Sequence, residues 1–202
     1  MNSSDILTLQ GSDALVVVDI QYDFIPGGTL SVTGGDLVIE PLNHAITVFH
    51  DRNLPIFFTR DWHPSHHCSF EENNGSWPPH CVQGTKGAEF VSTLFMPDDA
   101  VIISKGAHLE YDQYSTAFGV DDQGRTLESI LHGLDVKRVF IGGLATDYCV
   151  LNSVTDLKKE GFDVFVLRDG SAAVNVHPGD EQRAIETMKE LGASLITTKM
   201  IG

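Results

Sequence analysis

Residues 139 to 151 read VFIGGLATDYCVL, and this stretch decides the fold. It begins as an apolar strand, continues with Gly142-Gly143, which we expect to form a tight turn, and ends as the start of a helix. Cys149 falls in the first turn of that helix, where unpaired backbone N–H groups and the helix dipole favour thiolate over thiol. Two interpretations of Cys149 follow: a nucleophile, or a buried cysteine that acts only as a small hydrophobic residue.

Short apolar runs of the same kind recur along the chain and alternate with segments of helical periodicity. The other runs cover residues 14–19, 55–59, 101–104, 163–167 and 194–197, and the helical segments cover 36–52, 127–131, 147–161 and 180–191. Strands that alternate with helices through short connections are typical of an α/β fold. We therefore predict a doubly wound, mostly parallel six-stranded sheet with helices on both faces. No repeat or linker interrupts the pattern, so residues 1–202 are expected to form a single domain.

Composition excludes several classes of partner. The chain has 28 acidic and 13 basic residues and a formal net charge of -15, which disfavours nucleic acid and anionic lipid. No apolar segment reaches the length of a membrane span, and the N-terminus MNSSDILTLQ lacks the features of a signal peptide. Cys68, Cys81 and Cys149 are too few and too scattered for a disulfide framework. We expect a cytoplasmic protein that binds neither nucleic acid nor membranes.

Three predicted strands end in groups that could take part in a reaction. Asp19 ends the first, Lys105 follows the third, and Cys149 lies just beyond the fourth. Singly, each has an ordinary explanation: a helix-capping acid, a solvated strand end, a buried thiol. Carboxyl ends of parallel strands, however, meet at the sheet edge where such folds bind ligands. An aspartate there can take the proton of a thiol while a lysine stabilises the thiolate, which predicts a nucleophilic amidase site.

A second cluster suggests a metal ion. Four of the nine histidines lie between residues 61 and 81. Asp61 and His63 are two residues apart, so their side chains share one side of an extended segment. His80 follows two prolines that keep the chain extended, and it can complete a three-ligand site that suits Zn, Fe or Mn. The alternative is a polar surface loop whose histidines only form hydrogen bonds.

Five motifs, in this order from about residue 14 to 170, carry a family resemblance: VVVDIQYDF, TRDWHP, SWPPHCVQGT, SKGA and GLATDYCV. Together they resemble the nicotinamidase/pyrazinamidase family of isochorismatase-like cysteine hydrolases. The Asp, Lys and Cys motifs mark the wider superfamily, whereas Asp-x-His and PPHC separate the metal-bearing nicotinamidases from isochorismatases and carbamoyl amidases. The resemblance implies hydrolysis of nicotinamide to nicotinate and ammonia through a Cys149 thioester, as a step of NAD salvage, and hydrolysis of pyrazinamide to pyrazinoate.

The resemblance also assigns roles to individual residues. It implies a catalytic triad of Asp19, Lys105 and Cys149, and one divalent metal ion held by Asp61, His63 and His80. It implies an oxyanion hole formed by the N–H groups of Ala145 and Cys149, after a cis peptide between Leu144 and Ala145. The pyridine ring of the substrate would be held by Phe24, Trp77 and Tyr114. It leaves open which metal is bound (Zn, Fe or Mn) and which group is the fourth ligand (His66, His67 or water). It also leaves open the oligomeric state, and a homo-oligomer is compatible with it. Tyr148 stands where some members carry histidine, so its role is open too.

Three other functions are compatible with parts of this pattern. The triad could act on another small amide or on isochorismate. A metal-bound hydroxide could be the nucleophile, with Cys149 structural, which would make the protein a metallohydrolase. The chain could also be a catalytically silent binding or scaffold protein of the same fold, although the complete triad speaks against this.

Overall fold

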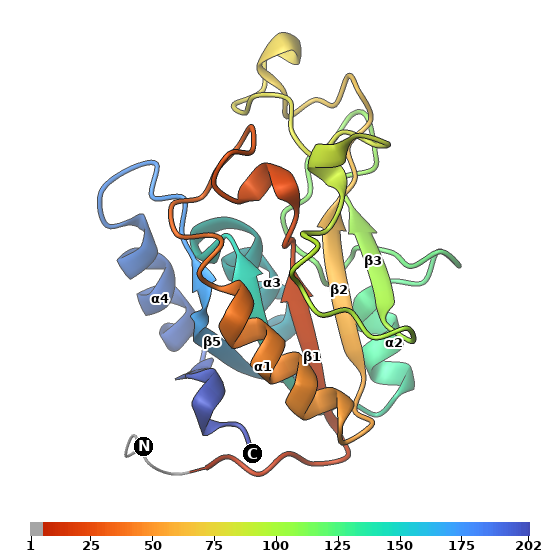
Figure 1. The fold of residues 1–202 in the computed structure, drawn as a ribbon, viewed down its shortest axis with the longest axis vertical. Helices are drawn as coiled ribbons and strands as arrows, with labels where there is room; N and C mark the ends of the chain where they lie inside the picture. The colour runs from red at the N-terminus through yellow and green to blue at the C-terminus, as the bar shows by residue number, and fades with distance from the viewer. Residues whose placement is uncertain (1–5) are drawn as a thin grey trace.

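One six-stranded sheet organises the molecule (Figure 1). The computed structural model describes residues 6–202; the first five residues of the N-terminal segment assessed for a signal peptide lie outside this range. The strands are β1 (Asp13–Val18), β2 (Ile56–Asp61), β3 (Val101–Lys105), β4 (Arg138–Leu144), β5 (Asp163–Ala172) and β6 (Ser194–Ile196). They lie in the order β3-β2-β1-β4-β5-β6, and every pair is parallel. The predicted doubly wound, parallel six-stranded sheet is confirmed.

Helices cover both faces of the sheet and give it two cores. The helices are α1 (Ile39–His50), α2 (Leu127–Gly133), α3 (Leu151–Lys159) and α4 (Asp180–Glu190). Leu15 and Val17 of β1 pack with α1 in one core, whereas Val16 and Val18 pack in the other with α2, α3 and α4. Strands buried on both faces need apolar side chains at every position, which explains the continuous run in β1.

The carboxyl ends of β1 to β4 meet at one edge of the sheet, toward the long loops drawn at the top of Figure 1. Asp61 and Lys105 belong to the strands that end at this edge. Each is the last residue of its strand, and the two are register partners. From the sequence, both are predicted just beyond their strands, because the apolar runs end at residues 59 and 104. Their side chains are therefore held by the sheet and not by a loop.

The prediction of a turn at Gly142-Gly143 is wrong. Both glycines lie inside β4, where Gly143 pairs with Val18 of β1. Gly143 has φ +132, and a Cβ atom there would lie 2.1 Å from the Val18 carbonyl oxygen. Only glycine fits this backbone conformation and this close approach.

The chain leaves β4 through a cis peptide between Leu144 and Ala145, as the resemblance implies, and then forms a π-helical turn over Thr146–Val150. The predicted helix therefore begins with a wider turn, and α3 itself starts only at Leu151. Single π-helical turns are rare and occur often at functional sites. Cys149 lies within this turn.

β5 is longer than predicted and irregular. It continues to Ala172, and its register against β4 shifts between Ile141 and Gly143. Such a bulge redirects the strand, and it brings the segment around Val174 to the edge where β1 and β4 end.

Within residues 6–202, no helix combines the length and apolar character that crossing a membrane requires.

Candidate active site

The structure brings Asp19, Lys105 and Cys149 together. Lys105 Nζ lies 2.9 Å from Asp19 Oδ2 and 3.3 Å from Cys149 Sγ. A carboxylate oxygen of Asp19 lies within 4.8 Å of the same sulfur. The three residues are 0%, 1% and 6% exposed, so the group is almost fully shielded from water.

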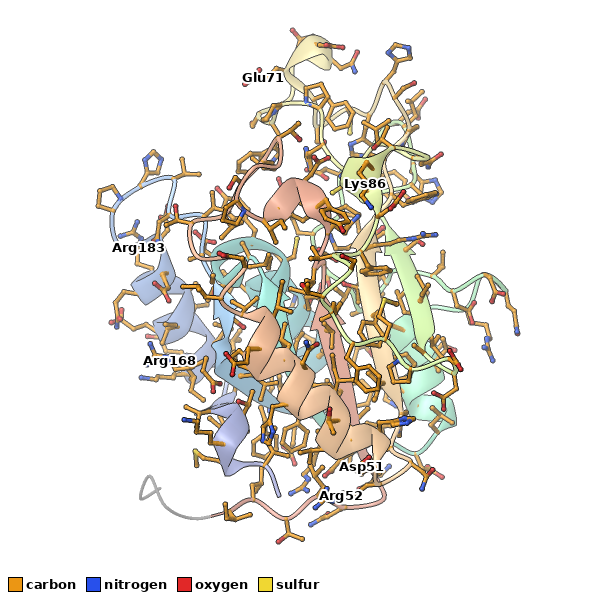
Figure 2. The ribbon with its side chains drawn as sticks, in the orientation of Figure 1. Asp51, Arg52, Glu71, Lys86, Arg168 and Arg183 are labelled. Atoms are coloured by element: carbon orange, nitrogen blue, oxygen red, sulfur yellow. The ribbon has the colours of Figure 1, made fainter. Side chains whose placement is uncertain are left out.

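Lys105 is the only buried lysine or arginine among residues 6–202. The charged side chains labelled in Figure 2, Glu71, Lys86, Arg168 and Arg183 among them, are exposed. Lys105, in contrast, forms ion pairs with the carboxylates of both Asp19 and Asp61. A buried ammonium is stable only where opposite charges and hydrogen bonds compensate for lost hydration.

These ion pairs determine the charge states. Burial alone would lower the pKa of Lys105, but the two carboxylates raise it well above its usual value, so the ammonium stays charged. Burial raises the pKa of Asp19, and the neighbouring Lys105 charge offsets only part of that effect. Burial would also raise the pKa of Asp61, but Lys105 and His63 outweigh it and hold that pKa below its usual range. Of the two acids, Asp19 accepts a proton more readily.

Thr59, which is not among the residues predicted for the site, orients Asp19. Its hydroxyl donates a 2.6 Å hydrogen bond to Asp19 Oδ1, which leaves Oδ2 to Lys105. Asp19 has φ +52, an uncommon conformation for a residue other than glycine, directly after β1. The signal for Thr59 is a lone hydroxyl directly after the apolar run Pro55–Phe58.

The expectation that Cys149 favours the thiolate is wrong for the resting site. Burial raises the pKa of the Cys149 thiol well above its usual value; Lys105 lowers it only in part, and the charges of Asp19 and Asp61 raise it further. Complete desolvation outweighs the effect of a helix N-terminus. The thiol is therefore protonated at neutral pH and needs a base, and Asp19 is the nearby carboxylate with the raised pKa.

Asp61, His63 and His80 form a second buried cluster. Each offers a ligand atom, and these atoms lie within 4.8 Å of one another. A parallel bridge between His63 and Val82 holds the two histidine segments side by side. His63 and His80 use Nδ1 to hydrogen-bond the carbonyls of Gly106 and Pro78, each at 2.8 Å. A nitrogen that faces a carbonyl must donate, so Nε2 of both rings carries the free lone pair that a metal binds. The donor set fits one divalent ion.

The two other histidines of this region differ from each other. His66 is exposed. His67 is buried, and its ring nitrogens face the Ser69 hydroxyl at 2.7 Å and the Tyr111 carbonyl at 3.3 Å. Its ring centroid is 4.2 Å from that of His63, yet among residues 6–202 neither His66 nor His67 joins the cluster of convergent ligand atoms. The fourth ligand therefore stays open.

Gly106 offers a direct test of the His63 geometry. It has φ +62, and a Cβ atom there would lie 2.4 Å from His63 Cε1. We expect Gly106→Ala to displace the His63 ring and to weaken zinc affinity at least about tenfold, as measured by titration of the metal-free protein. Gly124→Ala is the matched control: its φ is +76, so it bears a similar backbone cost, but nothing lies within 4 Å of its Cβ position. Equal zinc affinity of the two variants would contradict the role of His63 as a ligand.

A pocket joins the two clusters. Its lining residues are Phe24, Leu30, Val32, Asp61, Trp77, His80, Tyr114, Ala145, Tyr148, Cys149 and Val174. All three aromatic residues assigned by the resemblance are among them, and Trp77 Nε1 donates to the Tyr114 hydroxyl at 2.9 Å. The apolar residues Leu30, Val32 and Val174 carry no signal in the sequence, because only the tertiary fold brings them here. A larger surface hollow beside the amino ends of β2 and β3 holds none of these groups.

Tyr148 belongs to the same wall. Its ring lies against those of Trp77 and Tyr114, with centroids 5.1 and 5.7 Å away. Ala145 and Cys149, whose N–H groups are predicted to form an oxyanion hole, also line the pocket. The pocket thus combines aromatic walls, a thiol and two of the metal-cluster residues.

Comparisons with known proteins point to one family. The model of the isochorismatase domain matches residues 13–200. The nicotinamidase of Escherichia coli (strain K12) is 34% identical over 203 residues, which cover 91% of this chain and 94% of that protein. A crystal structure of the pyrazinamidase of Pyrococcus horikoshii in complex with zinc has 47% identity and a TM-score of 0.85, covering 92% of this chain and 99% of that one. PnC1 from L. infantum in complex with nicotinate has 36% identity and a TM-score of 0.87, covering 98% of both chains.

Proposed function

The chain belongs to the isochorismatase family, and from that premise we propose that it is a metal-dependent cysteine amidohydrolase that converts nicotinamide to nicotinate and ammonia. One observation carries the proposal: a single aromatic pocket is lined by Cys149 and also by Asp61 and His80 of the metal cluster. A flat pyridine carboxamide has a ring nitrogen at one end and an amide carbon at the other, so it can meet both clusters at once.

The relatives support the same substrate. The E. coli relative is a nicotinamidase. The structure of the P. horikoshii pyrazinamidase holds zinc, and that of PnC1 from L. infantum holds nicotinate. We extend the proposal to pyrazinamide, which has the same carboxamide on a similar ring. We place the activity in NAD salvage in the cytoplasm, carried by residues 1–202 as one hydrolase domain. The three cysteines, all free thiols, suit a reducing compartment.

The first half of the reaction uses the triad. Asp19 takes the proton of the Cys149 thiol, and Sγ attacks the carboxamide carbon. Lys105 keeps its charge throughout, stabilises the thiolate and holds the Asp19 carboxylate in place. The N–H groups of Ala145 and Cys149 hold the negative oxygen that forms. Asp19 then gives its proton to the departing nitrogen, ammonia leaves, and a thioester on Cys149 remains.

The second half reverses the proton movement. Asp19 takes a proton from a water molecule, whose oxygen attacks the thioester carbon. The carbon–sulfur bond breaks, nicotinate leaves, and the proton returns to the Cys149 sulfur. A divalent ion held by Asp61, His63 and His80, whether Zn, Fe or Mn, would bind the ring nitrogen and so orient the carboxamide toward the thiol.

Ammonia release from nicotinamide, with and without metal, tests the proposal. We expect chelation to lower the turnover rate by about 10²-fold, because a substrate that has lost its orienting contact is misplaced relative to Cys149. Added zinc should restore the rate. Pyrazinamide and isochorismate serve as comparison substrates. If the metal-free protein keeps full activity, or if isochorismate is consumed and nicotinamide is not, the proposed function is wrong and another hydrolase of the superfamily is the better assignment.

A further inference from the structure

Gln21 forms an unusual contact with a predicted metal ligand. Its side-chain amide is 0% exposed and faces the backbone of Asp61, from which it is 40 residues away in sequence. Nε2 donates to the Asp61 carbonyl at 2.8 Å and to the Ala88 carbonyl at 3.0 Å, and Oε1 accepts from the Asp61 N–H at 2.8 Å. Both amide hydrogens and the amide oxygen thus have backbone partners.

This amide takes the place of a neighbouring strand. The β1–β2 ladder ends where the Asp19 N–H donates to the Thr59 carbonyl at 3.1 Å. Two residues further along β2, the Gln21 side chain pairs with the N–H and the carbonyl of Asp61, as a main-chain peptide would. Without it, both backbone groups of Asp61 that face β1 would be buried with no partner, which is costly.

The amide is itself held firmly. Gln21 forms an isolated antiparallel bridge with Phe90. On either side of it, the Tyr22 N–H donates to the Glu89 carbonyl and the Val91 N–H donates to the Ile20 carbonyl, each at 3.0 Å. A side chain that is anchored at its base and fully bonded at its tip can fix the position of the backbone that it contacts.

The carboxylate of Asp61 depends on that position. Its Oδ1 pairs with Lys105, and its Oδ2 lies 3.7 Å from His63 Nε2, so the two oxygens serve two different neighbours. We propose that Gln21 is a positioning residue for the metal centre: its amide holds the Asp61 backbone so that one oxygen pairs with Lys105 and the other faces the ion. This inference rests on the proposed function, because it requires that the cluster binds a metal.

Zinc affinity of the full chain tests the inference. Gln21→Met keeps the length of the side chain and removes all three hydrogen bonds. In a titration of metal-free protein with zinc against a chromogenic chelator, we expect the Kd to rise about 10- to 100-fold. Gln83→Met is the matched control, because Gln83 Nε2 also donates to a neighbouring carbonyl, that of Trp62 at 2.8 Å, but the residue is exposed. Its zinc Kd should equal that of the wild type.

A merely structural role predicts a different result. Gln21→Met would then lower the thermal unfolding midpoint of the metal-free protein and leave the zinc Kd unchanged, which would overturn the inference. If Gln21→Met does not fold, Gln21→Asn replaces it, since a shorter amide remains buried but cannot reach both groups of Asp61, and the same rise in Kd is expected. A wild-type chain that binds no zinc would also overturn the inference. A chain that binds zinc but does not hydrolyse nicotinamide would refute only the proposed function.

Discussion

Cys149→Ala is expected to lower nicotinamide turnover at least about 10⁴-fold, because no thioester can form without the sulfur and the remaining groups cannot replace a nucleophile. Ammonia release under saturating nicotinamide measures the effect. The substitution removes only one small buried atom, and Asp61, His63 and His80 keep their contacts, so the zinc affinity of the variant should match that of the wild type.

Cys68→Ala is the control for this prediction. Cys68 is a free, partly exposed thiol outside the pocket, and its removal should leave the turnover rate unchanged. Substantial nicotinamidase activity of Cys149→Ala would show that the thiol is structural. The nucleophile would then have to be a hydroxide on the metal, and the protein would be a metallohydrolase.

Asp19→Asn is expected to lower kcat by about 10³-fold, the range in which a positioned acid-base group contributes. Asparagine has the same shape, and its oxygen can still accept the Thr59 hydrogen bond. It cannot take the proton of a thiol whose pKa is raised well above its usual value by burial, so the attack step loses its base. Steady-state kinetics should show a lower kcat with little change in KM, since Asp19 does not belong to the residues that line the pocket.

Asp23→Asn separates this effect from a general loss of buried charge. Asp23 is a buried acid at the same edge of the sheet, but its carboxylate accepts from the backbone N–H groups of Cys81 at 2.8 Å and Thr29 at 3.3 Å. An asparagine oxygen can keep one of these bonds, and the residue touches neither Lys105 nor Cys149. We expect its kcat to stay near that of the wild type. Equal losses in the two variants would mean that Asp19 acts through the fold and not through proton transfer.

The parts of the fold that follow from local pattern were predictable. A strand buried on both faces needs a continuous apolar run, so the run at residues 14–19 indicates a central parallel strand, and the aspartate that ends it marks the reactive edge. The same reasoning places Asp19, Lys105 and Cys149 together before any coordinates are known. Spacing alone likewise groups Asp61 with His63.

The parts that depend on a distant neighbour were not predictable. Gly142-Gly143 suits a turn as well as a strand, and the Val18 carbonyl, far away in sequence, decides for the strand. The thiolate prediction for Cys149 considered its position in the helix but could not include the depth of its burial. Gln21 and Thr59 look like ordinary polar residues until the pairing of β1 with β2 sets them beside Asp61 and Asp19.

The position of Lys105 on β3 has a consequence for how the protein folds. β3 is an edge strand that contacts the rest of the sheet only through β2, and its chain must cross a long stretch of loops before it docks. Until β3 docks, no ammonium lies between Asp19 and Asp61. The repulsion between their two carboxylates then opposes the close approach of the carboxyl ends of β1 and β2. Docking of β3 therefore supplies the positive charge that the two buried carboxylates need, which links completion of this edge of the sheet to assembly of the catalytic site.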